Sequence, residues 1–92
     1  MTMKRSISAR VYGKVQGVWF RASTKEIADG LEIKGIVRNE NGGTVYIEAQ
    51  GDEEAMKHFL EWMNEGPRHA EVERVEVNEI AQQNFTEFRI TP

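Results

Sequence analysis

The sequence contains no cysteine among its 92 residues, and this absence excludes several classes of protein. Without cysteine the chain forms no disulfide, performs no thiol chemistry and holds no metal through sulfur. Redox roles are therefore excluded. The absence also suits a reducing compartment, so we expect the protein to be cytoplasmic.

Long apolar runs are missing as well. No stretch approaches the roughly 20 apolar residues that a membrane-spanning helix requires. The segment from Met1 to Arg5 is not followed by an apolar stretch long enough for a signal peptide. We therefore expect a soluble, intracellular protein with no membrane partner.

Positive charge is not in excess either. Lysine and arginine number 12 against 15 aspartates and glutamates, which gives a net charge of −3 at pH 7. Most nucleic-acid binders carry a basic surface, so nucleic acid is not an expected partner. Any site for an anion must then be local.

The sequence also lacks a pattern of metal ligands. His58 is expected on the polar side of a helix and His69 in a loop, and neither has another ligand at close spacing. Because there is no cysteine to assist them, a zinc site is not expected. We predict no metal and no cofactor.

The residues that are present predict one small folded unit. Ninety-two residues with 39% hydrophobic content support one core and no more, so residues 1–92 are predicted to form a single domain. Ile7, Ala9 and Val11 alternate with polar residues, as in a strand with one buried face.

The order of the periodic segments predicts the fold class. The elements expected after this first strand are a helix over about 22–31, a strand over 36–39, a hairpin turn over 40–43, a strand over 44–49, a helix from the N-cap Asp52 to Gly66-Pro67, a strand over 75–78 and a short strand over 85–90. This β-α-β-β-α-β order is typical of the α+β ferredoxin-like fold, also called split βαβ. Two helices would cover one face of an antiparallel sheet, with a short fifth strand at the C-terminus.

The connection between the first strand and the first helix favours anion binding. Gly13 and Gly17 allow positive φ, so successive backbone N–H groups can point into one concavity. Arg21 adds a planar charged fork at the positive end of the helix dipole. From the spacing alone, a tight connection with a merely solvated arginine explains the pattern equally well, and the loop matches neither common nucleotide-binding glycine motif.

Two sequence blocks carry a resemblance to a known family. The run Gly13–Arg21, GKVQGVWFR, resembles the G-x-V-Q-G-V-x-F-R signature of the acylphosphatases, and Gly35–Asn39, GIVRN, resembles their G-x-V-x-N segment. The blocks lie at the expected distance from each other. The likeness continues through Gly42-Gly43-Thr44-Val45, Gly51, Gly66-Pro67 and Phe88-Arg89-Ile90, and so covers essentially the whole chain.

The resemblance implies a metal-independent acylphosphatase, which hydrolyses the carboxyl-phosphate bond of small acyl phosphates to a carboxylate and inorganic phosphate. It implies two catalytic residues: Arg21, which binds the phosphate, and Asn39, which orients the nucleophilic water. The phosphate-binding residues expected beside Arg21 are Lys14, Val15, Gln16, Gly17 and Val18, through their main-chain amides. A phosphate oxygen of the substrate is expected to take the proton from water. We expect the chain to act as a monomer, with the acyl phosphate as its partner.

Two positions depart from the family pattern. Ile36 stands where the family usually has tryptophan, which is expected to alter packing more than chemistry. Glu32 stands where a glycine commonly ends the first helix, and Gly30 lies two residues earlier. The helix therefore either stops at Gly30 or tolerates a weak turn there.

Several alternatives stay open at this point. Without the resemblance, Asn39 is an ordinary strand-end asparagine, and Trp19 lies either at the mouth of the site or in packing. A regulatory domain that binds a phosphorylated metabolite without turnover would keep the loop but has no evident use for Asn39. RNA-recognition domains share the element order, but they need a basic surface and exposed aromatics, and the strand over 44–49 offers only Tyr46.

Overall fold

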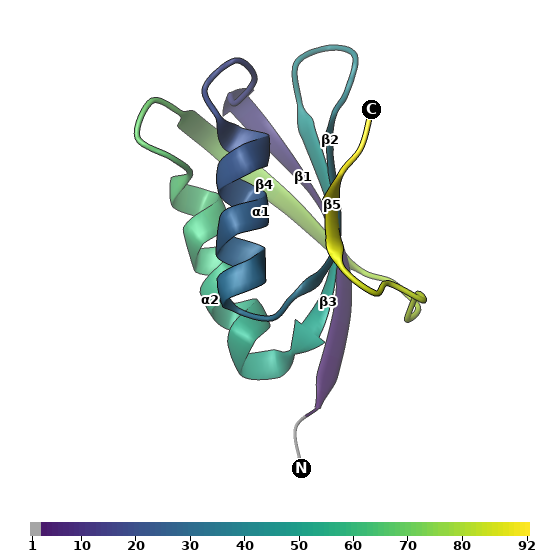
Figure 1. The fold of residues 1–92 in the computed structure, drawn as a ribbon. Helices are drawn as coiled ribbons and strands as arrows, with labels where there is room; N and C mark the ends of the chain where they lie inside the picture. The colour runs from purple at the N-terminus through teal and green to yellow at the C-terminus, as the bar shows by residue number, and fades with distance from the viewer. Residues whose placement is uncertain (1–2) are drawn as a thin grey trace.

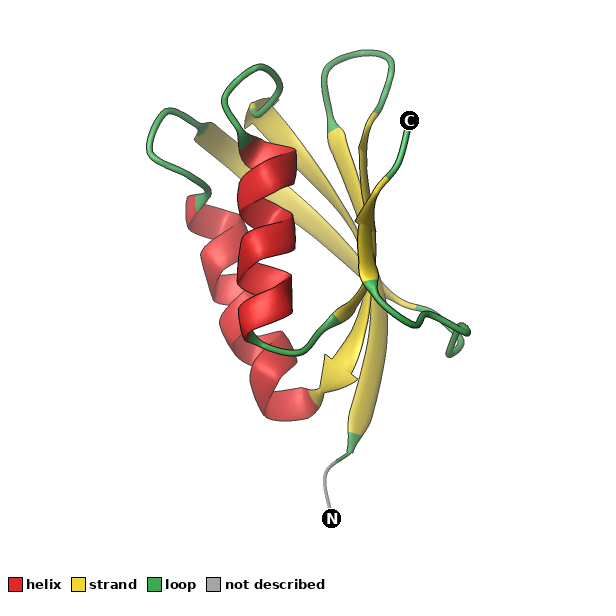
Figure 2. Cartoon of the chain, in the orientation of Figure 1, coloured by secondary structure: helices red, strands yellow, loops and turns green. Residues whose placement is uncertain are grey.

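The computed structural model describes residues 3–92, which form a five-stranded sheet with two helices on one face (Figures 1 and 2). Met1 and Thr2, which belong to the segment where no signal peptide is expected, lie outside the described residues. In chain order the elements are β1 (Lys4–Lys14), α1 (Phe20–Gly30), β2 (Lys34–Asn39), β3 (Val45–Asp52), α2 (Glu53–Glu65), β4 (Glu71–Glu79) and β5 (Phe88–Ile90).

The strands follow the order β4-β1-β3-β2-β5 across the sheet. The pairs β1–β4, β1–β3 and β2–β3 are antiparallel, whereas β5 joins β2 in parallel. The predicted α+β ferredoxin-like fold is therefore confirmed, including the short C-terminal strand. Because that strand pairs in parallel, the five-stranded sheet is mixed.

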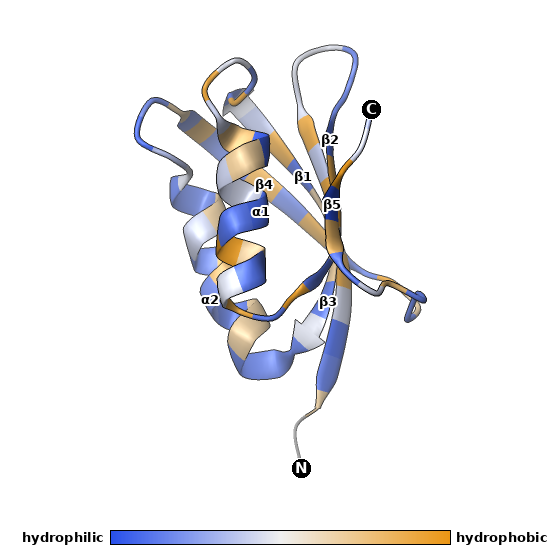
Figure 3. Ribbon diagram, viewed as in Figure 1, coloured by the Kyte–Doolittle hydropathy of each residue, from blue (hydrophilic) through white to orange (hydrophobic). Residues whose placement is uncertain are grey.

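The hydrophobic core lies between the helices and the covered face of the sheet. Apolar and polar residues alternate along the strands, as the coloured bands in Figure 3 show. The alternate residues of β1 and β3 that face the helices are at most 1% exposed. The side chains at the centre of the core are Ile7, Ala9, Val11, Val37, Val45, Ile47, Ala49, Met56, Phe59, Met63 and Phe88.

Several element bounds differ from the sequence prediction. Strand β2 covers 34–39 instead of 36–39, and β3 covers 45–52 instead of 44–49. Helix α1 begins at Phe20 rather than near residue 22, directly after the loop residue Trp19. Strand β4 covers 71–79 instead of 75–78, because it pairs with β1 along almost its whole length. Strand β5 is shorter than the predicted 85–90 and covers only 88–90.

The end of α1 resolves the question that Gly30 raised. The helix ends at Gly30, and Glu32 takes a left-handed φ of 58°. The amide of Ile33 donates to the Ala28 carbonyl at 2.8 Å, and that of Glu32 donates to Asp29 at 3.2 Å. These two bonds form a Schellman motif, in which the left-handed position normally favours glycine. Glu32 therefore occupies the turn position where the family pattern has glycine.

Candidate functional site

A cleft opens at the end of the sheet where β1 leads into α1, β2 leads into β3, and the chain leaves β5. These three segments come together at the same end of the molecule (Figure 1). The cleft has a volume of about 370 Å³. It is lined by Val15, Gly17, Trp19, Phe20, Arg21, Ala22, Asn39 and Ile90.

The loop between β1 and α1 forms one wall of this cleft. It leaves β1 at a bulge, where Gly13 has a φ of 125° and a Cβ atom would collide with the backbone of Glu71. Gly17 has a φ of 74°, so both predicted positive-φ glycines are confirmed. Within residues 3–92, the backbone amides of Gln16, Gly17 and Val18 donate to no protein acceptor. They are therefore available to an anion in the adjoining cleft.

Arg21 and Asn39 line the same cleft but belong to different elements. Arg21 is the second residue of α1, where the helix dipole favours negative charge, and Asn39 is the last residue of β2. The Arg21 side chain is exposed, and in the described part of the chain it pairs with no carboxylate. The two residues are 18 positions apart in sequence, and the fold brings them to one site.

The other predicted residues have different positions relative to the cleft. Val15 and Gly17 line it, whereas Lys14, Gln16 and Val18 do not. Lys14 is exposed at the end of β1, and the Val18 side chain is 8% exposed and packs in the core. A role of these last three residues toward a ligand therefore rests on their backbone amides.

The Gln16 side chain joins the loop to the hairpin between β2 and β3. Its Nε2 donates to the carbonyl oxygens of Glu40 and Thr44, each at 2.9 Å. These two carbonyls lie on either side of the turn that follows Asn39. The bonds therefore fix the loop that carries the free amides relative to the end of β2.

A second set of contacts holds the same hairpin to β1. The Arg10 guanidinium donates from Nε to Glu40 Oε1 at 2.7 Å and from Nη2 to Oε2 at 2.9 Å. The Thr44 hydroxyl also donates to Glu40 Oε1, at 2.8 Å. Two parallel bonds between a guanidinium and a carboxylate define orientation as well as distance. Glu40 is thereby fixed directly next to Asn39.

This arrangement changes the ionisation of both charged partners. The hydrogen bonds from Arg10 are the main cause of the lowered pKa of Glu40, which falls from 4.5 to about 2. Partial burial opposes this effect, and the Thr44 hydroxyl adds to it. Bonding to Glu40 also raises the pKa of Arg10 above its ordinary value. Glu40 is therefore ionised at neutral pH and keeps both of its donors.

The sequence prediction missed this network. It assigned Glu40 to the hairpin turn, treated the residues that alternate with Ile7, Ala9 and Val11 only as the polar side of a strand, and gave Gln16 only a backbone role. Arg10 and Glu40 are 30 residues apart, and their meeting depends on how the hairpin leans over β1. The pattern of apolar and polar residues along the chain does not predict how the hairpin lies relative to β1.

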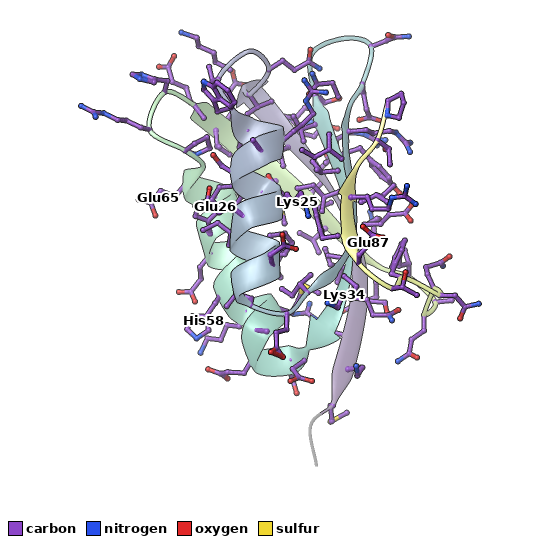
Figure 4. All side chains as sticks on the ribbon, in the orientation of Figure 1. Lys25, Glu26, Lys34, His58, Glu65 and Glu87 are labelled. Carbon is purple, nitrogen blue, oxygen red and sulfur yellow. The ribbon has the colours of Figure 1, made fainter. Side chains whose placement is uncertain are left out.

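Strand β5 brings a residue from near the C-terminus to the cleft. The Lys25 Nζ on α1 donates to the Phe88 carbonyl at 2.9 Å, and the Thr91 amide donates to Val37 at 2.9 Å. In Figure 4, Lys25 lies between α1 and β5. These bonds, together with the pairing to β2, hold Ile90 at the cleft wall.

The described part of the chain contains no cluster of metal ligands. From Met3 to Pro92, no group of three or more histidine, aspartate or glutamate side chains lies close enough to hold a metal ion. His58 is exposed on α2, away from the cleft (Figure 4), and lies 3.6 Å from Glu54 and 3.8 Å from Glu61. Neither α1 nor α2 has the length and apolar character needed to cross a membrane.

Fold and cleft together define an α+β protein in which an arginine and free backbone amides gather at the N-terminus of a helix. Comparison with known proteins identifies its family. The sequence model of the acylphosphatase family matches residues 7–90. An acylphosphatase of Ligilactobacillus salivarius is 46% identical over 83 residues, which cover 88% of this chain and 91% of that protein.

Solved structures agree with the sequence comparison. The acylphosphatase of Coxiella burnetii superimposes with a TM-score of 0.93 at 36% identity, covering 96% of this chain and 93% of the other. That of Bacillus subtilis gives a TM-score of 0.93 at 32% identity, covering 98% and 100%. The chain belongs to the acylphosphatase family. The predicted family and the predicted enzyme class are thereby confirmed.

Proposed function

We propose that this chain hydrolyses small acyl phosphates in the cleft between the β1–α1 loop and the end of β2. The observation that carries the proposal is that Arg21 and Asn39 line one cleft beside three free backbone amides. The products are a carboxylate and inorganic phosphate. No metal or cofactor takes part.

Arg21 and the loop amides bind the phosphoryl group of the substrate. The transferred phosphoryl group carries its charge on three equatorial oxygens. The Arg21 guanidinium bonds two of them, and the free amides of Gln16, Gly17 and Val18 bond the rest. Hydrogen bonds to a charged group contribute roughly 1.5–3 kcal/mol each, so the set supplies a useful part of the barrier reduction.

Asn39 positions the attacking water. A carboxamide offers one acceptor and two donors without adding negative charge beside a phosphate. The contacts of Gln16 and Glu40 hold the hairpin that follows Asn39. A fixed hairpin supports a fixed direction for the Asn39 side chain. A phosphate oxygen of the substrate accepts the proton from this water, since no side chain of the cleft is a general base.

The leaving group needs no assistance from a protein acid. A carboxylate leaves as a weak base, because the pKa of its conjugate acid is about 4. The enzyme therefore has to position the reactants and neutralise charge. This explains how so few polar side chains line the cleft.

Phosphate release from benzoyl phosphate in the presence of a chelator tests the proposal. We expect turnover by the parent protein with the chelator present. We expect Asn39→Ala to lower kcat by about 100-fold or more with little change in KM, and Arg21→Ala to impair both. A protein that binds phosphate but releases none from benzoyl phosphate would be a binding domain, and the proposal would be wrong.

Matched controls separate these roles from general effects. Lys34→Ala removes an exposed positive charge. Lys34, which is labelled in Figure 4, lies at the opposite end of β2 from Asn39. Asn78→Ala removes an exposed asparagine from β4. We expect parental kinetics from both. If Asn39→Ala were as active as Asn78→Ala, the water-positioning role would be refuted.

A further inference from the structure

The cleft has an apolar rim that phosphate binding does not use. The large apolar side chains exposed in residues 3–92 are Met3, Trp19, Val77 and Ile90, and two of these four line the cleft. Trp19 is 78% exposed and Ile90 is 43% exposed. They come from separate elements, the loop before α1 and strand β5, and meet at one site.

The backbone of Trp19 adds a second observation. Trp19 takes the left-handed conformation, with φ 66° and ψ 19°, although it is not glycine. Such a conformation is costly for a side chain of this size and tends to occur at ligand sites. The indole stacks on none of the described aromatic rings, whereas Phe20, Phe59 and Trp62 form contacts with one another. Core packing therefore does not explain its position.

Ile90 is held firmly although it lies near the end of the chain. Its neighbour Phe88 is buried and meets Phe59 edge to face, with ring centroids 6.0 Å apart. Lys25 bonds the Phe88 carbonyl, and Ile90 itself pairs with Val37 in the sheet. The Ile90 side of the rim is thus held by the sheet, by the core and by Lys25 of α1.

The geometry of the substrate connects this rim to the reaction. An acyl phosphate has a charged phosphoryl end and an acyl end joined through one bridging oxygen. If Arg21 and the loop amides hold the phosphoryl end, the acyl end extends to the remaining lining of the cleft, which is apolar at Trp19, Ala22 and Ile90. An apolar acyl group placed there removes the two exposed side chains from water.

We infer that Trp19 and Ile90 form an acyl-binding surface that selects acyl phosphates with an aromatic or bulky apolar acyl group over acetyl phosphate. This inference rests on the proposed function, because it takes the phosphoryl end to lie at Arg21. A planar ring gains most from contact with the Trp19 indole, whereas a methyl group covers little of either side chain.

The test compares kcat/KM for benzoyl phosphate and acetyl phosphate across variants. The two substrates differ in intrinsic reactivity, so the measured quantity is the change in their ratio. Trp19→Asn removes the ring and keeps a residue that tolerates the left-handed backbone. We expect it to lower the benzoyl-to-acetyl ratio by about fivefold, mainly through the KM of benzoyl phosphate. Trp19→Phe restores most of the ratio, and Ile90→Thr lowers it by about threefold.

The outcomes separate this inference from the proposed function. Val77→Thr changes an exposed apolar residue of β4 outside the cleft and should leave the ratio at its parental value. Ile90→Thr, a surface change of similar shape, supplies an independent result if Trp19→Asn folds poorly. If the parent hydrolyses both substrates and neither variant changes the ratio, the acyl-binding surface is refuted while the hydrolase proposal stands. If the parent hydrolyses neither, both fail.

Discussion

Glu40 accepts hydrogen bonds from two directions, from the guanidinium of Arg10 on β1 and from the hydroxyl of Thr44 across the turn. The Glu40 side chain is 20% exposed. At the scale of single residues, this carboxylate is the group that links β1 to the hairpin of the site. Its charge therefore contributes to folding as well as to the position of Asn39.

The lowered pKa of Glu40 predicts how stability depends on pH. Because the folded-state pKa is about 2 against 4.5 for the free group, the stabilisation is complete above about pH 4.5 and is lost as the pH falls toward 2. Glu40→Gln should lower the free energy of unfolding by about 1–2 kcal/mol at pH 7. In urea denaturation, the difference between parent and variant should be smaller at pH 3 than at pH 7.

An exposed ion pair provides the control for Glu40. Glu79 accepts from Arg5 Nε at 2.8 Å, but its side chain is 61% exposed. Glu79→Gln should cost less than about 1 kcal/mol, because solvent screens the pair. A loss at Glu40 that is equally large at pH 3 and pH 7 would show that its charge is not the stabilising feature.

At the scale of elements, the end of α1 shows what the sequence can and cannot predict. The two positions concerned are Gly30, the last residue of the helix, and Glu32 in the turn that follows. The helix and its amphipathic face follow from local periodicity, and both are present, whereas the sequence left the end of the helix open. The turn itself departs from local preference, because Glu32 and not Gly30 takes the left-handed position. The Schellman bonds of Ile33 and Glu32 and the packing of Ile33 in the core hold it there.

Replacing Glu32 by glycine should therefore stabilise the protein. The left-handed conformation costs a side-chain residue about 1–2 kcal/mol, and glycine loses part of that gain through extra freedom in the unfolded chain. We expect Glu32→Gly to raise the free energy of unfolding by about 0.5–1 kcal/mol, measured by urea denaturation. Glu32→Gln removes the same charge without relieving the backbone and should have little effect. If both variants raised the free energy of unfolding equally, the stabilisation would come from loss of the Glu32 charge and not from relief of the backbone conformation.

The sequence predicted the types and order of the elements better than their limits. Strand β4 is longer than predicted because its pairing partner β1 sets its length, and that partner is some 60 residues away. The bonds of Gln16 and the pairing of Arg10 with Glu40 depend in the same way on long-range geometry. Arg21 and Asn39, by contrast, were indicated by motif, and the fold brings both to one cleft.

At the scale of the whole molecule, the site depends on segments from the beginning, middle and end of the chain. Residues of the β1–α1 loop, the end of β2 and strand β5 all line the cleft. Phe88 connects this last strand to the core, where it is 1% exposed and packs against Phe59. Its burial holds the C-terminal segment on the sheet.

Phe88→Ala should strongly destabilise the fold. Removing a fully buried phenylalanine leaves a cavity and typically costs about 3–5 kcal/mol. We expect a loss in this range in urea denaturation. Phe85→Ala is the matched control, because Phe85 is only partly buried and lies in the segment before β5. A comparable loss in both variants would mean that Phe88 has no special role in anchoring the strand.

Strand β4 forms one edge of the sheet, and this edge bears on whether the protein aggregates. An edge strand presents free backbone groups that can pair with the edge of another molecule and begin aggregation. Along β4, exposed glutamates occur at positions 71, 73, 76 and 79. Two copies approaching edge to edge would bring these carboxylates together. Arg5 and Arg74 offset part of the charge at Glu79 and Glu76, and the remaining repulsion disfavours pairing through the nine-residue strand near neutral pH.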